Sequence, residues 1–412
     1  MKNETMKILL ITVLALSVTA AACRGQQRAQ EVDPTLTAVV DSLLPRLEQL
    51  SGLRKLKPIQ MKQQSREELR GYVQERLREE MPPEEMRGMK AAYAAFGLIA
   101  DTLDLEKLML DLYTEQVAGY YDPKTDAFYM VEGTPRDLLR PTLAHELVHA
   151  LQDQHANLDS LASRKRGNDR QTAAQAAIEG HATLVMFALL AGASDDFDAT
   201  VLPDMSQQLG PLMEAQNSQF PVFRSAPRII RETMLFPYIG GASFIQELWR
   251  AQASTADRFA APLGARLPQS TEQVLHAREK FTANKDEPTE IRFTQDGPGT
   301  LVYENTLGEL ELGILLGEHI GSRAAAAGWD GDRYRLVDLN GRPVLFWQTV
   351  WDDPASADRF AAAYQQVRAK RPARTIQVTR NRVGSMEGVW VIDAPAGTDV
   401  SALASVAATI VR

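Results

Sequence analysis

One segment decides the fold of this chain: Thr142-Leu143-Ala144-His145-Glu146-Leu147-Val148-His149-Ala150-Leu151-Gln152-Asp153-Gln154. Its apolar residues predict a buried helix that begins near Pro141 and continues past His149. His145 and His149 lie four residues apart, so both imidazoles project from one helix face and reach a single ion. Glu146 projects close by, toward a water on that ion. The segment therefore predicts a metal centre with two histidine ligands and a glutamate general base.

Zinc is the metal that this pattern favours. Three protein ligands leave its fourth position to a water, whose pKa falls to about 7. Glu146 would take a proton from that water and pass it to the leaving amine, which is the chemistry of peptide hydrolysis. The alternative without a metal is two surface histidines that flank a glutamate. The apolar helix disfavours it, because unpaired ionisable groups are costly in such a setting.

The third ligand has three candidates farther along the chain: Glu179, His155 and His181. His155 has the spacing of the metzincin motif, but that motif needs a glycine where this chain has Gln152. A continuing helix would point His155 away from the histidine pair. Glu179 lies in a small, apolar stretch of a second predicted helix, where a carboxylate is hard to explain unless it is paired. We therefore expect Glu179 to be the ligand and His181 to pack beside the metal helix.

Several segments resemble a family of predicted bacterial gluzincin-type zinc metallopeptidases, which are thermolysin-like and combine His-Glu-x-x-His with a downstream glutamate ligand. They are residues 115–123 (EQVAGYYDP), 145–155 (HELVHALQDQH), 177–182 (AIEGHA), 236–240 (FPYIG), 270–276 (STEQVLH) and 328–334 (GWDGDRY). The resemblance implies a zincin-like peptidase fold that binds Zn²⁺ through His145, His149 and Glu179. Thermolysin has an aspartate four residues after its ligand glutamate, where this chain has Thr183. That difference leaves open what orients His145.

Other side chains are candidates for supporting roles. Peptide hydrolysis needs a donor for the developing oxyanion, and Tyr238 is our first candidate for it, with His276 the second. Packing is the alternative reading for both residues. Asp153 follows His149 by four residues and is a candidate to orient its free ring nitrogen, although a solvent-facing carboxylate is an equal alternative. A strand at 127–131 is a candidate edge to which an extended substrate peptide adds.

The N-terminus has the pattern of an export signal. Lys2 and Lys7 precede an apolar run that is too short for a membrane span, so residues 1–22 predict a signal peptide. The run ends in three alanines before Cys23, the only cysteine, as in the lipobox of bacterial lipoproteins. We therefore expect export to the cell envelope and a membrane anchor through a lipid on Cys23. An ordinary secretory cleavage site is the alternative. Residues 23–34 are polar and predict a tether.

Composition and periodicity indicate an α+β protein. Hydrophobic residues make up 44% of the 412 residues, as in soluble globular proteins, and the net charge of −8 disfavours nucleic acid as a partner. Residues 35–297 predict a mainly helical zincin-like metallopeptidase domain, with a short β-hairpin (117–121 and 127–131) before the metal helix. The pattern from 35 to about 114 is helical, and a helix at about 171–190 is nearly all apolar after Gly180 and so is expected in the core. A further helix at 228–253 is expected to be interrupted near 236–238. Residues 298–412 predict a small α+β domain. The predicted elements there are helices at 307–327, 355–370 and 400–411, and strands at 334–339, 343–351, 375–379 and 388–392.

The function that we expect from these patterns is zinc-dependent hydrolysis of a peptide or protein substrate outside the cytoplasm. Two alternatives stay open. The chain could be a non-catalytic envelope lipoprotein of the same fold that binds a partner or peptidoglycan, although the presence of Glu146 disfavours this. It could also be a zinc hydrolase that acts on a non-peptide amide or ester.

Overall fold

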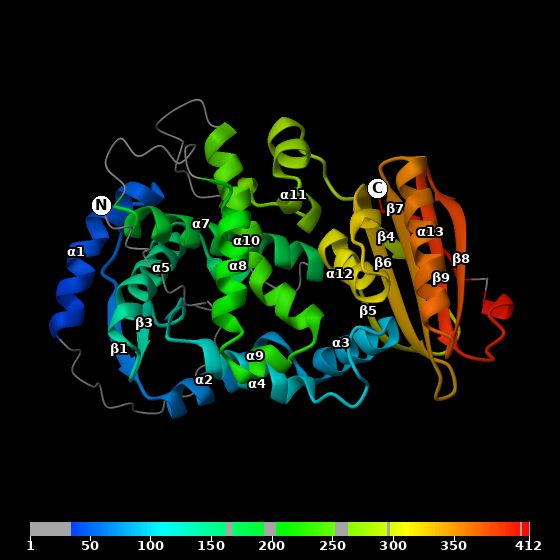
Figure 1. The fold of residues 1–412 in the computed structure, drawn as a ribbon, viewed down its shortest axis with the longest axis horizontal. Coiled ribbons are helices and arrows are strands. Elements are labelled where there is room, and N and C mark those ends of the chain that lie inside the picture. The colour runs from blue at the N-terminus through cyan, green and yellow to red at the C-terminus, as the bar shows by residue number, and fades with distance from the viewer. Residues whose placement is uncertain are drawn as a thin grey trace, which may run out of the picture.

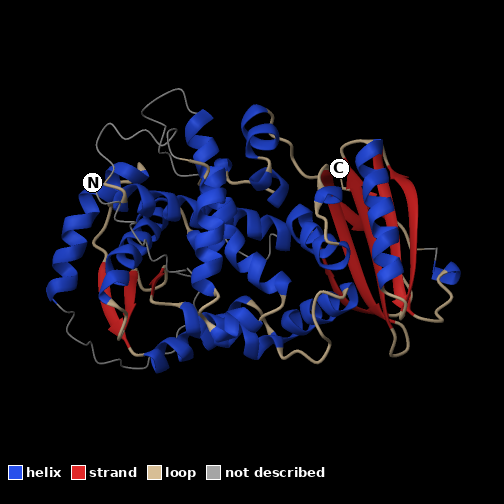
Figure 2. Cartoon of the chain, viewed as in Figure 1, coloured by secondary structure: helices blue, strands red, loops and turns tan. Residues whose placement is uncertain are grey.

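The fold was obtained as a computed structural model, which describes residues 34–161, 167–192, 203–251, 263–294, 297–403 and 406–411. The predicted signal peptide, Cys23 and the tether up to residue 33 lie outside these residues. The protein is α+β, with a helical body at one end and an antiparallel sheet at the other (Figures 1 and 2). The α-helices are α1 (Pro34–Ser51), α2 (Arg66–Glu80), α3 (Pro83–Phe96), α4 (Leu105–Gln116), α5 (Arg136–His155), α6 (Leu158–Leu161), α7 (Asn168–Leu190), α8 (Met205–Asn217), α9 (Pro221–Ser225), α10 (Arg228–Ala251), α11 (Thr271–Leu275), α12 (Gly308–Ile320) and α13 (Pro354–Lys370). The strands are β1 (Gln60–Gln64), β2 (Gly119–Asp122), β3 (Ala127–Val131), β4 (Ile291–Phe293), β5 (Thr300–Asn305), β6 (Trp329–Asp338), β7 (Pro343–Trp351), β8 (Arg374–Val383), β9 (Met386–Pro395) and β10 (Ala408–Ile410).

The small sheet of the helical body has three strands in the order β1-β3-β2. The predicted hairpin is present, since β2 and β3 pair antiparallel. Strand β1 was not predicted, because residues 35–114 were interpreted as helical and its polar sequence lacks a strand pattern. It pairs in parallel with β3. β3 is therefore the central strand, and the prediction that it is an edge open to a substrate peptide is wrong.

Helix α7 is the centre of the helical body and packs on both α5 and α10. The contact with α10 is close because glycines meet there. A Cβ on Gly180 would lie 2.0 Å from the carbonyl carbon of Gly241, so only glycine lets the two backbones approach this far. α7 is long and apolar enough to cross a membrane, but 83% of its most apolar window is buried inside the protein. It is a core helix, as its sequence predicted.

Helix α10 runs without interruption from Arg228 to Ala251. The prediction that it breaks near 236–238 is wrong, although Pro237 lacks the N–H that an inner helix position donates. Both flanks of the proline are held in place, since Phe236 and Tyr238 are buried and Gly241 lies against α7. Packing on α7 therefore outweighs the local cost of the proline. Similarly, α5 begins at Arg136, five residues before the expected start at Pro141.

The C-terminal unit is a five-stranded sheet in the order β5-β6-β7-β9-β8. Helices α12 and α13 pack on one face of it (Figure 1). Alternating strand residues face opposite ways, so Trp347 joins the main core while Phe346 belongs to a second core on the other face. The predicted helix at 400–411 is wrong. That segment forms a short 3₁₀ turn and then β10, which pairs with β4 because its β-branched residues favour a strand.

Other boundaries in this unit also differ from the prediction. α12 ends at Ile320, because Gly321 adopts the left-handed conformation (φ 72°) that terminates helices. β6 begins at Trp329, and β4 and β5 were missed. The unit is joined to the helical body by buried contacts. Phe96 of α3 makes edge-to-face contacts with Tyr334 and Trp347, with ring centroids 5.2 Å apart in both pairs. The two units therefore share one hydrophobic core.

Candidate metal centre

Three buried donor atoms meet between α5 and α7. Nε2 of His145 lies 3.0 Å from Nε2 of His149 and 3.1 Å from Oε2 of Glu179, and Nε2 of His149 lies 3.3 Å from the same oxygen. Ligands of tetrahedral zinc at about 2.0–2.1 Å are separated by roughly 3.3 Å. The three atoms, which we call the His–His–Glu group, therefore have nearly the separations that one zinc ion requires.

The other two candidates for the third ligand lie elsewhere. His155 hydrogen-bonds through Nε2 to the carbonyl oxygen of Arg54, 2.8 Å away. Nε2 of His181 is 3.2 Å from the carbonyl of Ser51, and its ring packs against Trp249 with the centroids 6.3 Å apart. The structure thus brings Glu179 to the histidine pair, whereas His155 contacts another segment. His181 packs beside α5 as expected, with its Nδ1 2.9 Å from the amide nitrogen of Gln152.

The ring of His149 is oriented by Gln152. Its Nδ1 donates to Oε1 of Gln152 at 2.8 Å, which leaves Nε2 to face the His–His–Glu group. The amide nitrogen of Gln152 donates in turn to the carbonyl of Ile178, next to Glu179 on α7. The prediction that Asp153 orients His149 is wrong, because Asp153 accepts hydrogen bonds from Tyr121 and Leu158 instead.

Glu146 is held beside the group with one oxygen anchored. Its Oε2 accepts the backbone N–H of Tyr121 at 2.7 Å, so β2 fixes the position of the carboxyl group. Its Oε1 is buried and has no hydrogen-bond partner among the described residues. A buried oxygen of this kind is costly unless something binds it, and a water between Glu146 and a metal would do so. Burial raises the pKa of Glu146 to about 8.

The electrostatics of the His–His–Glu group also suit a cation. Burial lowers the pKa of His145. Burial also opposes the charged form of His149, but Glu179 and Glu146 outweigh it and raise that pKa to about 9. Burial opposes the charge of Glu179 as well, yet the neighbouring histidines lower its pKa. No lysine or arginine of the described ranges forms an ion pair with Glu179. A divalent ion would replace protons here, and two imidazoles with a carboxylate are a donor set that zinc accepts.

The two candidates for the oxyanion donor have different positions. The ring of Tyr238 lies 6.1 Å from that of His145, centroid to centroid, and its residue lines the same cavity as Glu179. His276 lies at the end of α11, where its Nε2 is 2.8 Å from Oε1 of Glu309. It belongs neither to the His–His–Glu group nor to the lining of that cavity. Of the two candidates, only Tyr238 therefore lies near the His–His–Glu group.

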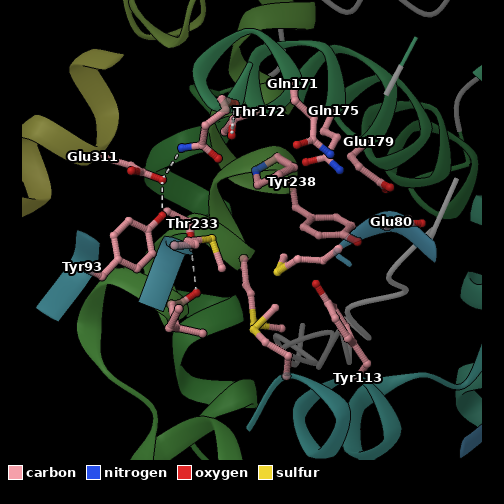
Figure 3. Close-up of a pocket in the computed structure, with 17 residues that line it drawn as sticks. Glu80, Tyr93, Tyr113, Gln171, Thr172, Gln175, Glu179, Thr233, Tyr238 and Glu311 are labelled. Carbon is pink, nitrogen blue, oxygen red and sulfur yellow. Dashed lines mark hydrogen bonds between the residues drawn. The ribbon is translucent and has the colours of Figure 1, made fainter. Parts of the chain in front are cut away.

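A cavity extends from the metal centre toward the C-terminal unit (Figure 3). It encloses about 930 Å³, part of it open to solvent. Gln171, Gln175 and Glu179 line it from successive turns of α7, and Tyr238 and Thr233 line it from α10. Sequence patterns did not reveal the cavity, because its residues come from distant segments.

Two parts of the site were not predicted from the sequence: the side chain of Gln152 and the backbone N–H of Tyr121. Gln152 follows His149 by three residues, a spacing that places it on the same helix face and that predicts the contact. The backbone N–H of Tyr121 has no such signal, since its position depends on how β2 packs against α5. Thr183, in the place of thermolysin's aspartate, is buried with an oxygen that has no described partner, so it does not orient His145.

A second group of ligand-type side chains lies farther along the chain. Glu272, Asp286 and Asp352, which we call the acidic group, are close enough to share an ion. The ammonium of Lys280 already lies among them, 3.1 Å from Glu272 and 2.6 Å from both Asp286 and Asp352. This lysine supplies the positive charge that a metal ion would otherwise bring.

Comparison with known proteins gives one match. Residues 292–411 match a family described as "Domain of unknown function (DUF8575)". No curated protein and no solved structure matches the chain. The match covers the C-terminal unit, and the residues of the metal centre lie outside it.

Proposed function

We propose that this protein is an exported zinc-dependent peptidase with a zincin-like catalytic domain of the gluzincin type. The observation that carries the proposal is the convergence of His145, His149 and Glu179 within 3.3 Å of one another, beside a buried glutamate. Glu146 has one oxygen fixed by Tyr121 and the other without a described partner. Both features have a simple explanation in a metallopeptidase.

Bound zinc would supply an activated water and would polarise the carbonyl group of the substrate. The protein's own residues would do the rest. Glu146 would take a proton through Oε1 from the attacking water, because Oε2 is occupied by the N–H of Tyr121. The same oxygen would then pass the proton to the amine that leaves. A carboxyl group with its pKa raised by burial is suited to hold a proton between these two steps.

Tyr238 would donate its hydroxyl proton in a hydrogen bond to the oxyanion that forms on the substrate carbonyl. Its ring lies near His145, and it comes from α10, which the glycine contact fixes against the ligand helix α7. One such donor contributes about 100- to 1,000-fold to the rate in other hydrolases. His276 is not proposed for this role, since it pairs with Glu309.

The N-terminal pattern supports the cellular part of the proposal. A signal peptide before Cys23 would deliver the enzyme to the cell envelope, with a lipid on that cysteine as its membrane anchor. Replacing the cysteine, Cys23→Ser, would release the protein from the membrane fraction into the soluble fraction. Retention of the variant with membranes would contradict a lipid anchor.

The test of the activity is to measure zinc content and cleavage of a denatured-protein library for wild type and Glu146→Gln. We expect one zinc per chain in both proteins and cleavage only by the wild type. Glu106→Gln is a matched control, because it changes an exposed glutamate of α4 in the same way and should keep full activity. Zinc without cleavage in the wild type would contradict peptidase activity and favour a non-catalytic protein or a hydrolase of non-peptide amides or esters.

A further inference from the structure

We propose that His181 is a positioning residue of the metal centre, which acts through Gln152 to keep the ring hydrogen of His149 on Nδ1 and its Nε2 ready to bind a metal ion. The inference rests on the proposed function, since it concerns how a ligand of that same site is held. It starts from the order in which donors and acceptors follow one another from α1 to α5.

The hydrogen bonds begin at a backbone carbonyl of α1. Nε2 of His181 lies 3.2 Å from the carbonyl oxygen of Ser51, the last residue of that helix, and both residues are fully buried. A carbonyl oxygen only accepts hydrogen bonds, so Nε2 carries a hydrogen and donates it. The neutral imidazole has one N–H, which leaves Nδ1 of His181 as an acceptor.

The amide of Gln152 has its orientation fixed by two acceptors. Its nitrogen lies 2.9 Å from Nδ1 of His181 and 3.0 Å from the carbonyl oxygen of Ile178. The amide nitrogen carries two hydrogens, and each of these acceptors takes one of them. Turning the amide over would place its oxygen against two acceptors. The oxygen Oε1 of Gln152 is therefore the atom that faces α5.

This orientation determines how the ring of His149 is protonated. Oε1 of Gln152 lies 2.8 Å from Nδ1 of His149 and accepts its hydrogen. A hydrogen on Nδ1 leaves the lone pair on Nε2, and the lone pair is what a metal ion binds. Nε2 of His149 is the atom that lies 3.3 Å from Oε2 of Glu179. Two backbone carbonyls thus favour the form of His149 that a metal centre needs.

Packing is the alternative role for His181. Its ring lies edge-on to that of Trp249, and α7 packs against both α1 and α10. A packing role depends on the volume of the side chain, whereas the positioning role depends on an acceptor at the place of Nδ1. Two amide substitutions separate the roles. In His181→Asn the side-chain oxygen takes nearly the place of Nδ1 and accepts from Gln152. In His181→Gln the amide nitrogen takes nearly the place of Nε2 and donates to Ser51, and the acceptor at Nδ1 is lost.

The first measurement is zinc affinity, by competition with a chromophoric chelator. We expect His181→Gln to weaken zinc binding about 10-fold, at the lower end of the effect of such partners because Ile178 still holds the amide, and His181→Asn to stay within about 2-fold of the wild type. His319→Gln is the matched control. His319 also donates from Nε2 to a backbone carbonyl, that of Phe96, but it lies on α12 away from the His–His–Glu group, so zinc affinity should not change.

The second measurement needs no zinc. NMR of the metal-free protein, isotope-labelled in its histidines, follows the exchange of the Nδ1 hydrogen of His149 with solvent. We expect exchange to become several-fold faster in His181→Gln and to stay near the wild-type rate in His181→Asn, because only the second variant keeps the amide of Gln152 oriented. Urea denaturation gives the opposite order. His181→Asn removes more volume, and also the contact with Ser51, so it should be the less stable variant.

Two results would overturn this inference while the proposed function stands: wild-type zinc affinity in His181→Gln, or equal losses of affinity in both amide variants, which indicate packing. If the wild type binds zinc without cleaving protein, the proposed peptidase activity fails and the same comparison of affinities still decides the inference. If the wild type binds no zinc, the proposed function fails as a whole. The exchange rates in the metal-free proteins then decide: faster exchange in His181→Gln alone supports the positioning role, and equal rates in all variants contradict it.

Discussion

The His–His–Glu group and the acidic group each contain three ligand-type side chains. They differ in that a lysine, Lys280, lies among the side chains of the acidic group. All three residues of the His–His–Glu group are buried, whereas Asp352 of the acidic group is exposed and Asp286 is half-buried. Lys280 contacts all three carboxylates of the acidic group. The ion pairs described for Glu179 involve histidines alone.

This difference teaches how to separate a metal centre from a structural cluster. A buried carboxylate needs a cation, a proton or several hydrogen-bond donors. The acidic group already has a cation, the ammonium of Lys280, so a metal ion would have to displace this lysine. The His–His–Glu group contains two imidazoles and one carboxylate, and its described ion pairs include no lysine or arginine, so a divalent ion would complete it.

Removal of a histidine ligand should have the largest effect. His149→Ala should lower zinc affinity on the order of 1,000-fold, because losing one of three ligands removes roughly a third of a zinc-binding free energy of about 10–16 kcal/mol. Asp286→Asn, in the acidic group, should leave zinc affinity unchanged. Competition with a chromophoric chelator measures both. A loss of zinc from the Asp286 variant would break the distinction between the two groups.

Removal of the lysine should affect stability instead. Lys280→Met should lower the free energy of unfolding by about 3 kcal/mol, since three carboxylates then face one another without a cation. Urea denaturation measures the loss. Lys285→Met is the control, because among the described residues that lysine pairs with one carboxylate, that of the exposed Glu287, and its loss should cost less than about 1 kcal/mol. Equal effects of the two variants would show that the acidic group does not depend on Lys280.

The orientation of His149 provides a smaller test within the metal centre. Gln152→Met removes the acceptor for Nδ1 and should weaken zinc binding about 10- to 100-fold. Asp153→Asn changes the neighbouring residue, which faces Tyr121, and should leave zinc affinity near the wild-type value. The reverse order of effects would favour the orientation that the sequence suggested. Isothermal titration of the metal-free proteins distinguishes the two.

Local spacing explains which parts of the site could be predicted. His145, Glu146 and His149 share one helical turn, so their geometry follows from the period of the helix. Glu179 was expected to join them because a carboxylate in an apolar helix needs a partner, and the structure places it there. The cavity was not predictable in the same way, because its lining combines residues as distant as Glu80 and Glu311.

The fold shows the same division. Helix α7 was expected in the core because its sequence is nearly all apolar after Gly180, and it lies there. Strand β1 was missed because its pairing with β3 comes from the backbone, and its side chains other than Met61 are polar. The continuous α10 and the strand β10 were also missed. In both, partners far away in the sequence outweigh local preference: α7 holds α10, and β4 pairs with β10.

The smallest expected effect concerns Asp169. Its carboxyl group is buried in a third way, with hydrogen-bond donors and a bound proton in place of a lysine or a metal ion. It lies at the start of α7, accepts hydrogen bonds from Thr271, and has no cation among the groups that shift its pKa. Burial raises that pKa to about 8, so the folded protein keeps a proton that the unfolded chain releases above about pH 4. Between these values unfolding releases a proton, and the free energy of unfolding falls as pH rises, by at most about 1.4 kcal/mol per pH unit for this group.

Asp169→Asn removes this contribution. The stability of wild type relative to the variant should therefore decrease from pH 5 to pH 6, as urea titrations at the two pH values would measure. A difference that is constant with pH would mean that Asp169 is ionised in the folded protein and relies on Thr271 alone.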